Sequence, residues 1–246
     1  MNTTSHSSVL LLHWAGLLAI ACLPCGFAQE PTADPPPPPP MIQTQVEFIE
    51  VTQERYTALL AGNHTTSNDS ALRQKLTEMV AKGEAEIVET MVVTAHQSEK
   101  ATAESLMEFI YPNDYVPATP PSNAATEGTE EPTGPLPLAW ETRKLGSTLE
   151  VEPTFDKESG TVDVRFEAEV VRHVKNWVWV EWNGKHGTSH VQMPVFHLLS
   201  CNQSVIVMPG EPLLAATLTP KGPGGMPDAS RKIMVFVKCD LIPPGK

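Results

Sequence analysis

Hydrophobic and polar residues alternate strictly through residues 143–170, which read RKLGSTLEVEPTFDKESGTVDVRFEAEV. Successive side chains lie on opposite faces of a strand, so this period of two predicts a pair of strands. Each strand has one apolar face, formed by Leu149 and Val151 in the first and by Val162, Val164, Phe166, Ala168 and Val170 in the second. Residues 156–160 supply the turn, because Gly160 tolerates a positive φ. The pattern leaves open whether this apolar face packs within one chain or against neighbouring copies.

Shorter patterns predict the other elements of the chain. Strands are expected over residues 41–52, 84–95, 101–110, 176–184, 204–208, 213–218 and 232–242, although residues 101–110 also fit a helical period. Capping residues and apolar spacing predict helices over 53–60 and 71–82. Residues 117–137, rich in Pro, Gly, Thr and Glu, are expected to be a mobile loop, and residues 185–190 a second polar loop. The sequence therefore predicts an α+β fold of antiparallel β-hairpins with two short helices.

The N-terminal segment, residues 1–28, has the features of an export signal. Its apolar core from Val9 to Leu23 is too short for a comfortable membrane span, and Gly26-Phe27-Ala28 resembles a cleavage site. A rival interpretation makes residues 19–22 a lipoprotein box, with lipid attached to Cys22. Residues 29–40 follow as a proline-rich linker that is stiff and extended. The folded domain is expected over residues 41–246.

Charge and motifs narrow the functional classes. The formal net charge is −12 and no basic stripe offsets it, which argues against nucleic acid as a partner. No nucleophile elbow, phosphate loop or zinc-protease motif occurs, so we expect neither an enzyme nor a cofactor. His186 and His190 lie in a polar, glycine-containing loop and are interpreted as solvated residues rather than metal ligands.

We also predict the structural roles of several individual residues. Export permits a disulfide between Cys201 and Cys239, and two buried thiols are the alternative. Trp177 and Trp179 share a strand face that could be a binding platform or an interfacial girdle, but packing inside the sheet is the favoured interpretation. We expect four residues to shape the fold: Gly83 and Gly210 in turns, and Gly146 and Pro153 in the ribbon of residues 143–170.

Five stretches, taken in order, resemble the C-terminal domain of bacterial secretins. They are VEFIEVTQERYTALLAG, LTEMVAKGEAEIVETMVVTAHQSEKATAESLMEFIYP, RKLGSTLEVEP, MPVFHLLSCNQSVIVMPGEPLLAATLTP and KIMVFVKCDLI. The third is similar to the most recognisable motif of the family, "VG..L.V.P". Secretins are ring-forming outer-membrane channels of type II and type III secretion and of type IV pili. The resemblance implies that the ribbons join those of neighbouring subunits, with the charged face of Asp163, Arg165, Glu167 and Glu169 suited to a water-filled lumen.

The chain also departs from the secretin pattern. Polar, glycine-rich residues 220–231 replace an amphipathic segment that sits in the outer-membrane leaflet in secretins, and Ala215 and Ala216 replace paired glycines. The proline run leads straight into Met41, where secretins carry small ring domains. The resemblance therefore implies the fold more directly than it implies a channel.

Two functional hypotheses follow. The first is an exported, homo-oligomeric envelope protein that works with secretion or pilus proteins as a component or accessory subunit of an outer-membrane channel. The second is a monomeric structural or binding module of the periplasm that kept the fold without forming a pore. We expect localisation in the periplasm or at the outer membrane under either hypothesis.

Overall fold

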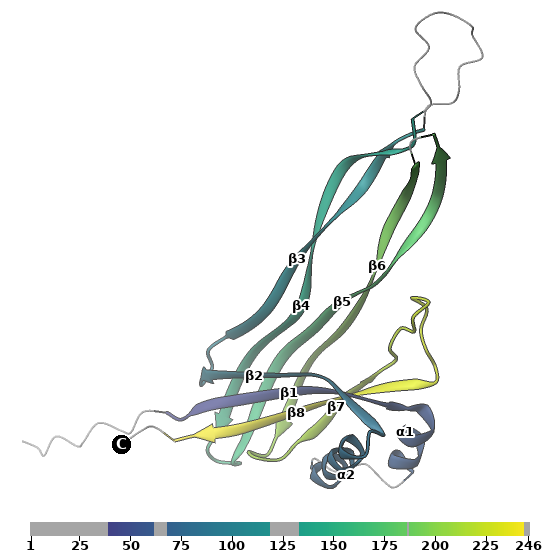
Figure 1. The fold of residues 1–246 in the computed structure, drawn as a ribbon. Helices are drawn as coiled ribbons and strands as arrows, with labels where there is room; N and C mark the ends of the chain where they lie inside the picture. Colours follow the sequence, from purple (N-terminus) through teal and green to yellow (C-terminus); the bar gives the residue numbers. More distant parts are fainter. Residues whose placement is uncertain (1–38, 62–67, 119–132, 186, 244–246) are drawn as a thin grey trace, which may run out of the picture. The chain divides into compact units, whose positions relative to one another are not determined.

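The computed structural model describes residues 39–61, 68–118, 133–185 and 187–243 (Figure 1). The predicted export signal of residues 1–28, including Cys22, and most of the linker lie outside the described residues. The elements are β1 (Met41–Thr52), α1 (Gln53–Leu60), α2 (Ser70–Ala81), β2 (Ala85–His96), β3 (Ala101–Val116), β4 (Leu136–Asp156), β5 (Thr161–Gly184), β6 (Gly187–Val207), β7 (Leu213–Leu218) and β8 (Arg231–Ile242). The α+β fold of antiparallel hairpins is confirmed.

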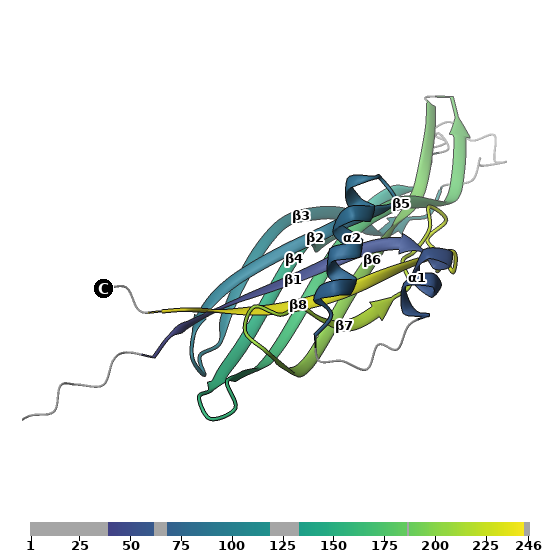
Figure 2. The same ribbon diagram turned by 90° about the horizontal axis from the view of Figure 1, so that it is seen from below.

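The strands form two antiparallel sheets of four. One has the order β2-β1-β8-β7, and the other has the order β3-β4-β5-β6 (Figures 1 and 2). The central strand β8 carries the continuous apolar run Ile233–Val237, and every residue of that run is buried. A strand with both faces covered needs such a run instead of an alternating pattern. Its two faces belong to two different hydrophobic cores.

The larger core lies between the two sheets. It joins residues of β1, β2 and β8 to the apolar faces of β4 and β5, including Leu149, Val151, Val162, Val164, Phe166, Ala168 and Val170. Each of these seven residues is buried within a single chain. The apolar face of residues 143–170 is therefore covered by the other sheet, and the hypothesis that neighbouring copies complete it is wrong. Any assembly has to use other surfaces.

The smaller core lies beneath the two helices. Leu72 and Leu76 of α2 pack with Ile49, Val51, Met234 and Phe236 from β1 and β8. Successive side chains of β1 lie on opposite faces of the strand, so Phe48 packs in the larger core and Ile49 in the smaller one. Thr52 caps α1 by accepting the Arg55 amide, as its residue type predicts.

Several predicted boundaries are wrong. β3 is a strand that continues to Val116, and β4 begins at Leu136, inside the predicted loop of 117–137. β6 begins at Gly187, inside the predicted loop of 185–190, and runs unbroken to Val207, although the sequence predicts a strand only from residue 204. Strand structure persists there because β5 pairs with β6 from Gly184↔Gly187 down to Val162↔Val207. Pairing with a partner strand overrides local pattern.

Candidate functional site: the distal hairpins

The sheet β3-β4-β5-β6 divides into two ribbons at Gly146. β4 pairs with β5 only from Asp156↔Thr161 to Gly146↔Val171. Beyond that point β3 stays paired with β4 as far as Val116↔Leu136, and β5 stays paired with β6 as far as Gly184↔Gly187. We call these two ribbons, residues 106–116 with 136–146 and residues 171–184 with 187–198, the distal hairpins.

Gly146 makes this division sterically feasible. Its φ is +132°, and a β-carbon on it would overlap the carbonyl oxygen of Ser105 on β3. Only glycine combines that backbone conformation with so close an approach. A pocket of about 420 Å³ opens where the ribbons part, and charged side chains of Glu104, Arg143 and Glu169 contribute to its wall.

The distal hairpins expose many large apolar side chains. These are Leu106, Met107, Ile110, Val116, Leu136, Leu138, Trp140, Trp177, Val178, Trp179, Val180, Met193 and Leu198. Trp179 is 65% exposed and Trp177 47%, with ring centroids 6.3 Å apart. The interpretation that Trp177 and Trp179 pack inside the sheet is therefore wrong, because β4 has already left β5 before these residues are reached.

Charge is distributed unevenly along the same ribbons. Residues 109–113, 133–140 and 176–180 contain no Asp, Glu, Lys or Arg. Charged residues flank these stretches, with Glu108, Glu141 and Lys175 on one side and Asp114 and Glu181 on the other. Exposed apolar surface of this extent, bounded by charge and rich in tryptophan, is typical of contacts with lipid or with another protein.

Aromatic side chains fill the space between the two ribbons. Phe109 of β3 stacks on His173 of β5, with ring centroids 4.7 Å apart, and meets Phe196 of β6 edge to face at 5.9 Å. Tyr111 lies 5.6 Å from Phe196, and burial, followed by hydrogen bonding to Glu141, raises the pKa of Tyr111. Tyr115 extends the contact by hydrogen bonding to the main chain of Gln192. The distal hairpins therefore pack on each other.

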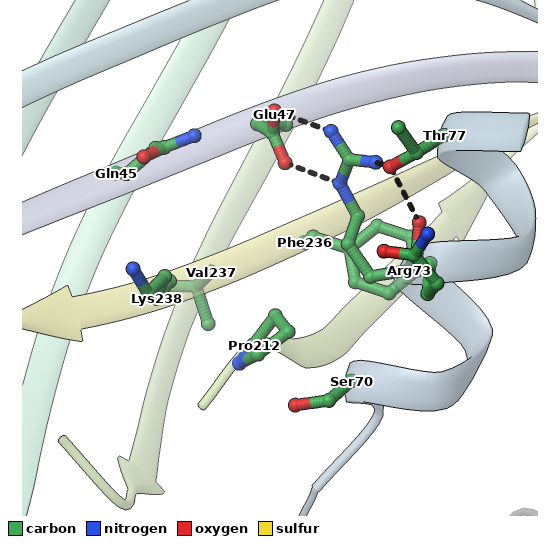
Figure 3. A pocket seen from close by; sticks show the side chains of 10 residues that line it. Gln45, Glu47, Ser70, Arg73, Thr77, Pro212, Phe236, Val237 and Lys238 are labelled. Carbon is green, nitrogen blue, oxygen red and sulfur yellow. Dashed lines mark hydrogen bonds and ion pairs between the residues drawn. The ribbon is translucent and has the colours of Figure 1, made fainter. Parts of the chain in front are cut away.

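An ion pair between Arg73 and Glu47 connects α2 to β1 (Figure 3). Arg73 donates from Nε to Glu47 Oε2 at 2.7 Å and from Nη2 to Glu47 Oε1 at 2.9 Å. This hydrogen bonding raises the pKa of Arg73, and Glu47 is only 8% exposed. The pair borders a pocket of about 290 Å³ whose wall includes Ser70 and Lys238. Since Arg73 and Glu47 satisfy each other, the pair fixes the helix to the sheet rather than awaiting a ligand.

Cys201 and Cys239 are buried free thiols, and the candidate disulfide between them is not formed. Cys201 lies on β6 and Cys239 on β8, in different sheets that face each other across the larger core. Burial raises the pKa of both thiols, and that of Cys239 reaches about 11. The Cys239 thiol contacts Thr44 Oγ1 at 3.6 Å.

The remaining predicted residues lie at turns and strand contacts. Gly83 follows α2 with φ +72°, and Gly210 lies between β6 and β7 with φ +83°. The Gly210 amide donates to the Cys239 carbonyl at 2.8 Å, so its turn is joined to the neighbouring strand. Pro153 is buried on β4, and its carbonyl accepts the Ser98 amide at 2.8 Å.

The histidines that the structure describes show no metal-site geometry. His190 lies 3.9 Å from Glu181, and His186 lies outside the described residues. His197 accepts the Lys221 amide at Nε2, and burial, followed by the charges of Lys221 and Arg172, lowers its pKa. Among the residues that the structure describes, no group of three or more His, Cys, Asp and Glu side chains is placed to hold a metal ion. Within the same residues, no helix has both the length and the apolar character needed to cross a membrane.

Comparison with known proteins gives structural matches alone. No family model matches the chain. No curated protein matches it either. Aeromonas hydrophila ExeD is similar at 13% identity and a TM-score of 0.38, over 84% of this chain and 49% of ExeD. The E. coli type II secretion system secretin GspD is similar at 14% identity and a TM-score of 0.37, over 83% of this chain and 50% of GspD. The Salmonella type III secretion injectisome secretin InvG is similar at 12% identity and a TM-score of 0.39, over 84% of this chain and 63% of InvG. The chain thus spans about half the length of the first two of these proteins.

Proposed function

We propose that the protein is an exported, secretin-like envelope subunit that assembles with copies of itself at the outer membrane, as a component or accessory subunit of a secretion or pilus channel. The observation that carries the proposal is the sheet β3-β4-β5-β6, whose outer strands β3 and β6 are 16 and 21 residues long. Long outer strands invite pairing with another chain, and closure into a ring removes such edges. The motif RKLGSTLEVEP lies in β4, within this sheet, and resembles the secretin motif.

The exposed apolar side chains of the distal hairpins support the membrane part of the proposal. A protein that stayed in water throughout would expose Trp140, Trp177 and Trp179 at the expense of solubility. Tryptophan is favoured where a protein meets the boundary between lipid and water. The distal hairpins are the surface that we assign to the outer membrane and to envelope partners. The proposal includes no catalytic step and no cofactor.

The mass of the exported protein, produced from the full-length coding sequence and extracted in mild detergent, tests this proposal. A large, heat-resistant assembly would support self-association through the outer strands. A monomer that stays in solution without detergent, at every concentration tested, would overturn it. The same sample, analysed by mass spectrometry, distinguishes cleavage before Gln29 from lipid attached at Cys22.

One observation favours the second candidate, a monomeric periplasmic module. Both hydrophobic cores are complete within one chain, so folding needs no neighbour. Under that function, the monomer would bind an envelope partner through the distal hairpins. Retention of the envelope partner by a protein that remains monomeric would favour this candidate over a self-assembling subunit.

A further inference from the structure

Side chains from two other parts of the chain bond to the outer edge of β6. This strand ends its sheet, so the main-chain groups on its outer side are where an incoming strand would pair. The Tyr115 hydroxyl donates to the Gln192 carbonyl at 3.1 Å and accepts the Gln192 amide at 3.2 Å. The Lys221 ammonium donates to the Phe196 carbonyl at 3.1 Å. Tyr115 thus satisfies both the donor and the acceptor of one edge residue, as a paired strand would do.

The bonded positions follow the period of the strand. Residues 192–195 of β6 pair without interruption with β5, from Gln192↔Val178 to Val195↔Lys175. Main-chain groups alternate between the two sides of a strand, so Gln192, Pro194 and Phe196 share the outer side. Pro194, the residue between the two bonded ones, has no N–H to offer. An added strand would need main-chain hydrogen bonds at these three positions. At Gln192 and Phe196 the main-chain groups are already bonded to side chains, and at Pro194 the N–H is missing.

The segment that carries Lys221 is itself ordered against β6. Lys221 bridges to Pro227, and the Asp228 amide donates to the Pro220 carbonyl at 2.8 Å. The Lys221 amide donates to His197 Nε2 at 3.3 Å. A β-carbon on Gly225 would come within 3.0 Å of Val195 Cγ1, so the backbone of this segment contacts β6 directly. The backbone of Lys221 is thus held beside β6, and its exposed side chain reaches the Phe196 carbonyl from there.

The opposite edge of the sheet differs. Residues 102–108 of β3 are exposed on both faces of the strand. The two edges that would meet in a ring are therefore unequal, with β3 accessible along this stretch and β6 covered between residues 192 and 197.

We propose that Tyr115 and the segment 219–230 form a latch, which covers the outer edge of β6 and delays the pairing of this edge with a second copy until the latch is released. The inference rests on the proposed function and deepens it, because it names the regulation of the same edge. The strand that the latch excludes is β3 of a second copy. Once the latch opens, Gln192 and Phe196 regain main-chain groups that can pair with that strand.

The test uses a double variant of the full-length exported protein, Tyr115→Phe with Lys221→Met. Both substitutions keep the size of the side chain and remove only the bonding group. Tyr56→Phe with Lys75→Met, at helical positions away from β6, is the matched control. The first readout is hydrogen exchange of the Gln192 amide, which we expect to be about three- to tenfold faster in the latch variant, since one hydrogen bond is lost.

The second readout is the binding of a labelled synthetic peptide with the sequence of residues 101–116, which stands in for the incoming strand. We expect the latch variant to bind this peptide at least about tenfold more tightly than the wild type and the control. Equal peptide affinity in all three proteins would overturn the latch, whether or not the proteins assemble. Tight peptide binding by a latch variant that never forms large assemblies would support the latch and overturn the proposed self-assembly. Assembly by the wild type and the latch variant at equal rates would overturn the latch and leave the proposed function standing.

Discussion

The carbonyl oxygen of Ser105 occupies the position where a β-carbon on Gly146 would lie. β3 and β4 can therefore approach each other at the dividing point of the sheet only because residue 146 has no side chain. The positive φ of Gly146 adds a second requirement for glycine at the same residue.

Replacement of Gly146 tests this relationship. Gly146→Ala should lower the free energy of unfolding by about 2–4 kcal/mol, because it forces both a steric overlap and an unfavourable φ. Gly83→Ala is the matched control: its φ is also positive, but a β-carbon there would meet nothing within 4 Å. That control should cost only about 1 kcal/mol. Urea unfolding of the two variants measures the difference, and equal losses would contradict a steric role for Gly146.

The ion pair between Glu47 and Arg73 should contribute far more to the free energy of unfolding than an exposed ion pair does. Arg73→Met leaves the Glu47 carboxylate largely buried without its partner, and we expect a loss of about 2–4 kcal/mol in the free energy of unfolding. Arg55→Met removes a comparable contact with Glu84, but those side chains are 42% and 35% exposed. That exposed pair should contribute about 0–1 kcal/mol. Similar losses in both variants would show that burial does not distinguish the two pairs.

Because the Cys239 thiol is buried, we expect the free energy of unfolding to fall as the pH rises above about 9. Its pKa rises from 9.0 to about 11 on folding, because burial disfavours the thiolate. Below pH 9 the thiol is protonated in both states, so its full contribution is present there. Between pH 9 and about 11 the unfolded chain ionises first, and the protein should lose on the order of 2 kcal/mol. Cys239→Ala should remove this part of the pH profile, measured as the difference from wild type so that other titrating groups cancel.

The exposed Trp179 should matter for association and not for folding. Trp179→Glu changes a side chain that is 65% exposed, so the free energy of unfolding should shift by less than about 0.5 kcal/mol. Binding to lipid vesicles, measured by flotation, should fall several-fold because a charge enters the apolar surface of the distal hairpins. Ile87→Glu, on the exposed face of β2 in the other sheet, is the control and should leave flotation unchanged. Unchanged flotation in the Trp179 variant would remove this surface from the membrane contact.

The sequence predicted the elements whose apolar pattern is local. The period of two in residues 149–170 identified the buried face correctly, and Thr52 marked the start of α1. β6 was missed over residues 187–203, since its strand structure depends on pairing with β5 and not on its own pattern. The tryptophans were misplaced because the division of the sheet at Gly146 depends on contacts between strands.

The contacts of the candidate site could not be predicted from a local sequence pattern, because they join residues that are far apart in the chain. Tyr115 and Gln192 are 77 residues apart, and a tyrosine hydroxyl bonded to a main chain leaves no mark on either segment. Glu47 and Arg73 are 26 residues apart, and only their opposite charges hinted at the pair. Gly146 was singled out from the sequence, but its physical role requires the position of Ser105.

The pairing of β1 with β8 has a consequence for the order of events in the cell. Met41 pairs with Ile242 and Thr52 with Arg231, so β1 lies beside β8, although the other described strands separate the two in sequence. β8 also supplies residues to both hydrophobic cores. Neither core has all of its residues until the ribosome has completed most of β8, and a chain exported as we propose lacks this central strand while the other described strands are synthesised. In the exported protein that we propose, the late synthesis of β8 would postpone the closure of both cores, so the chain would not yet be compact when export begins.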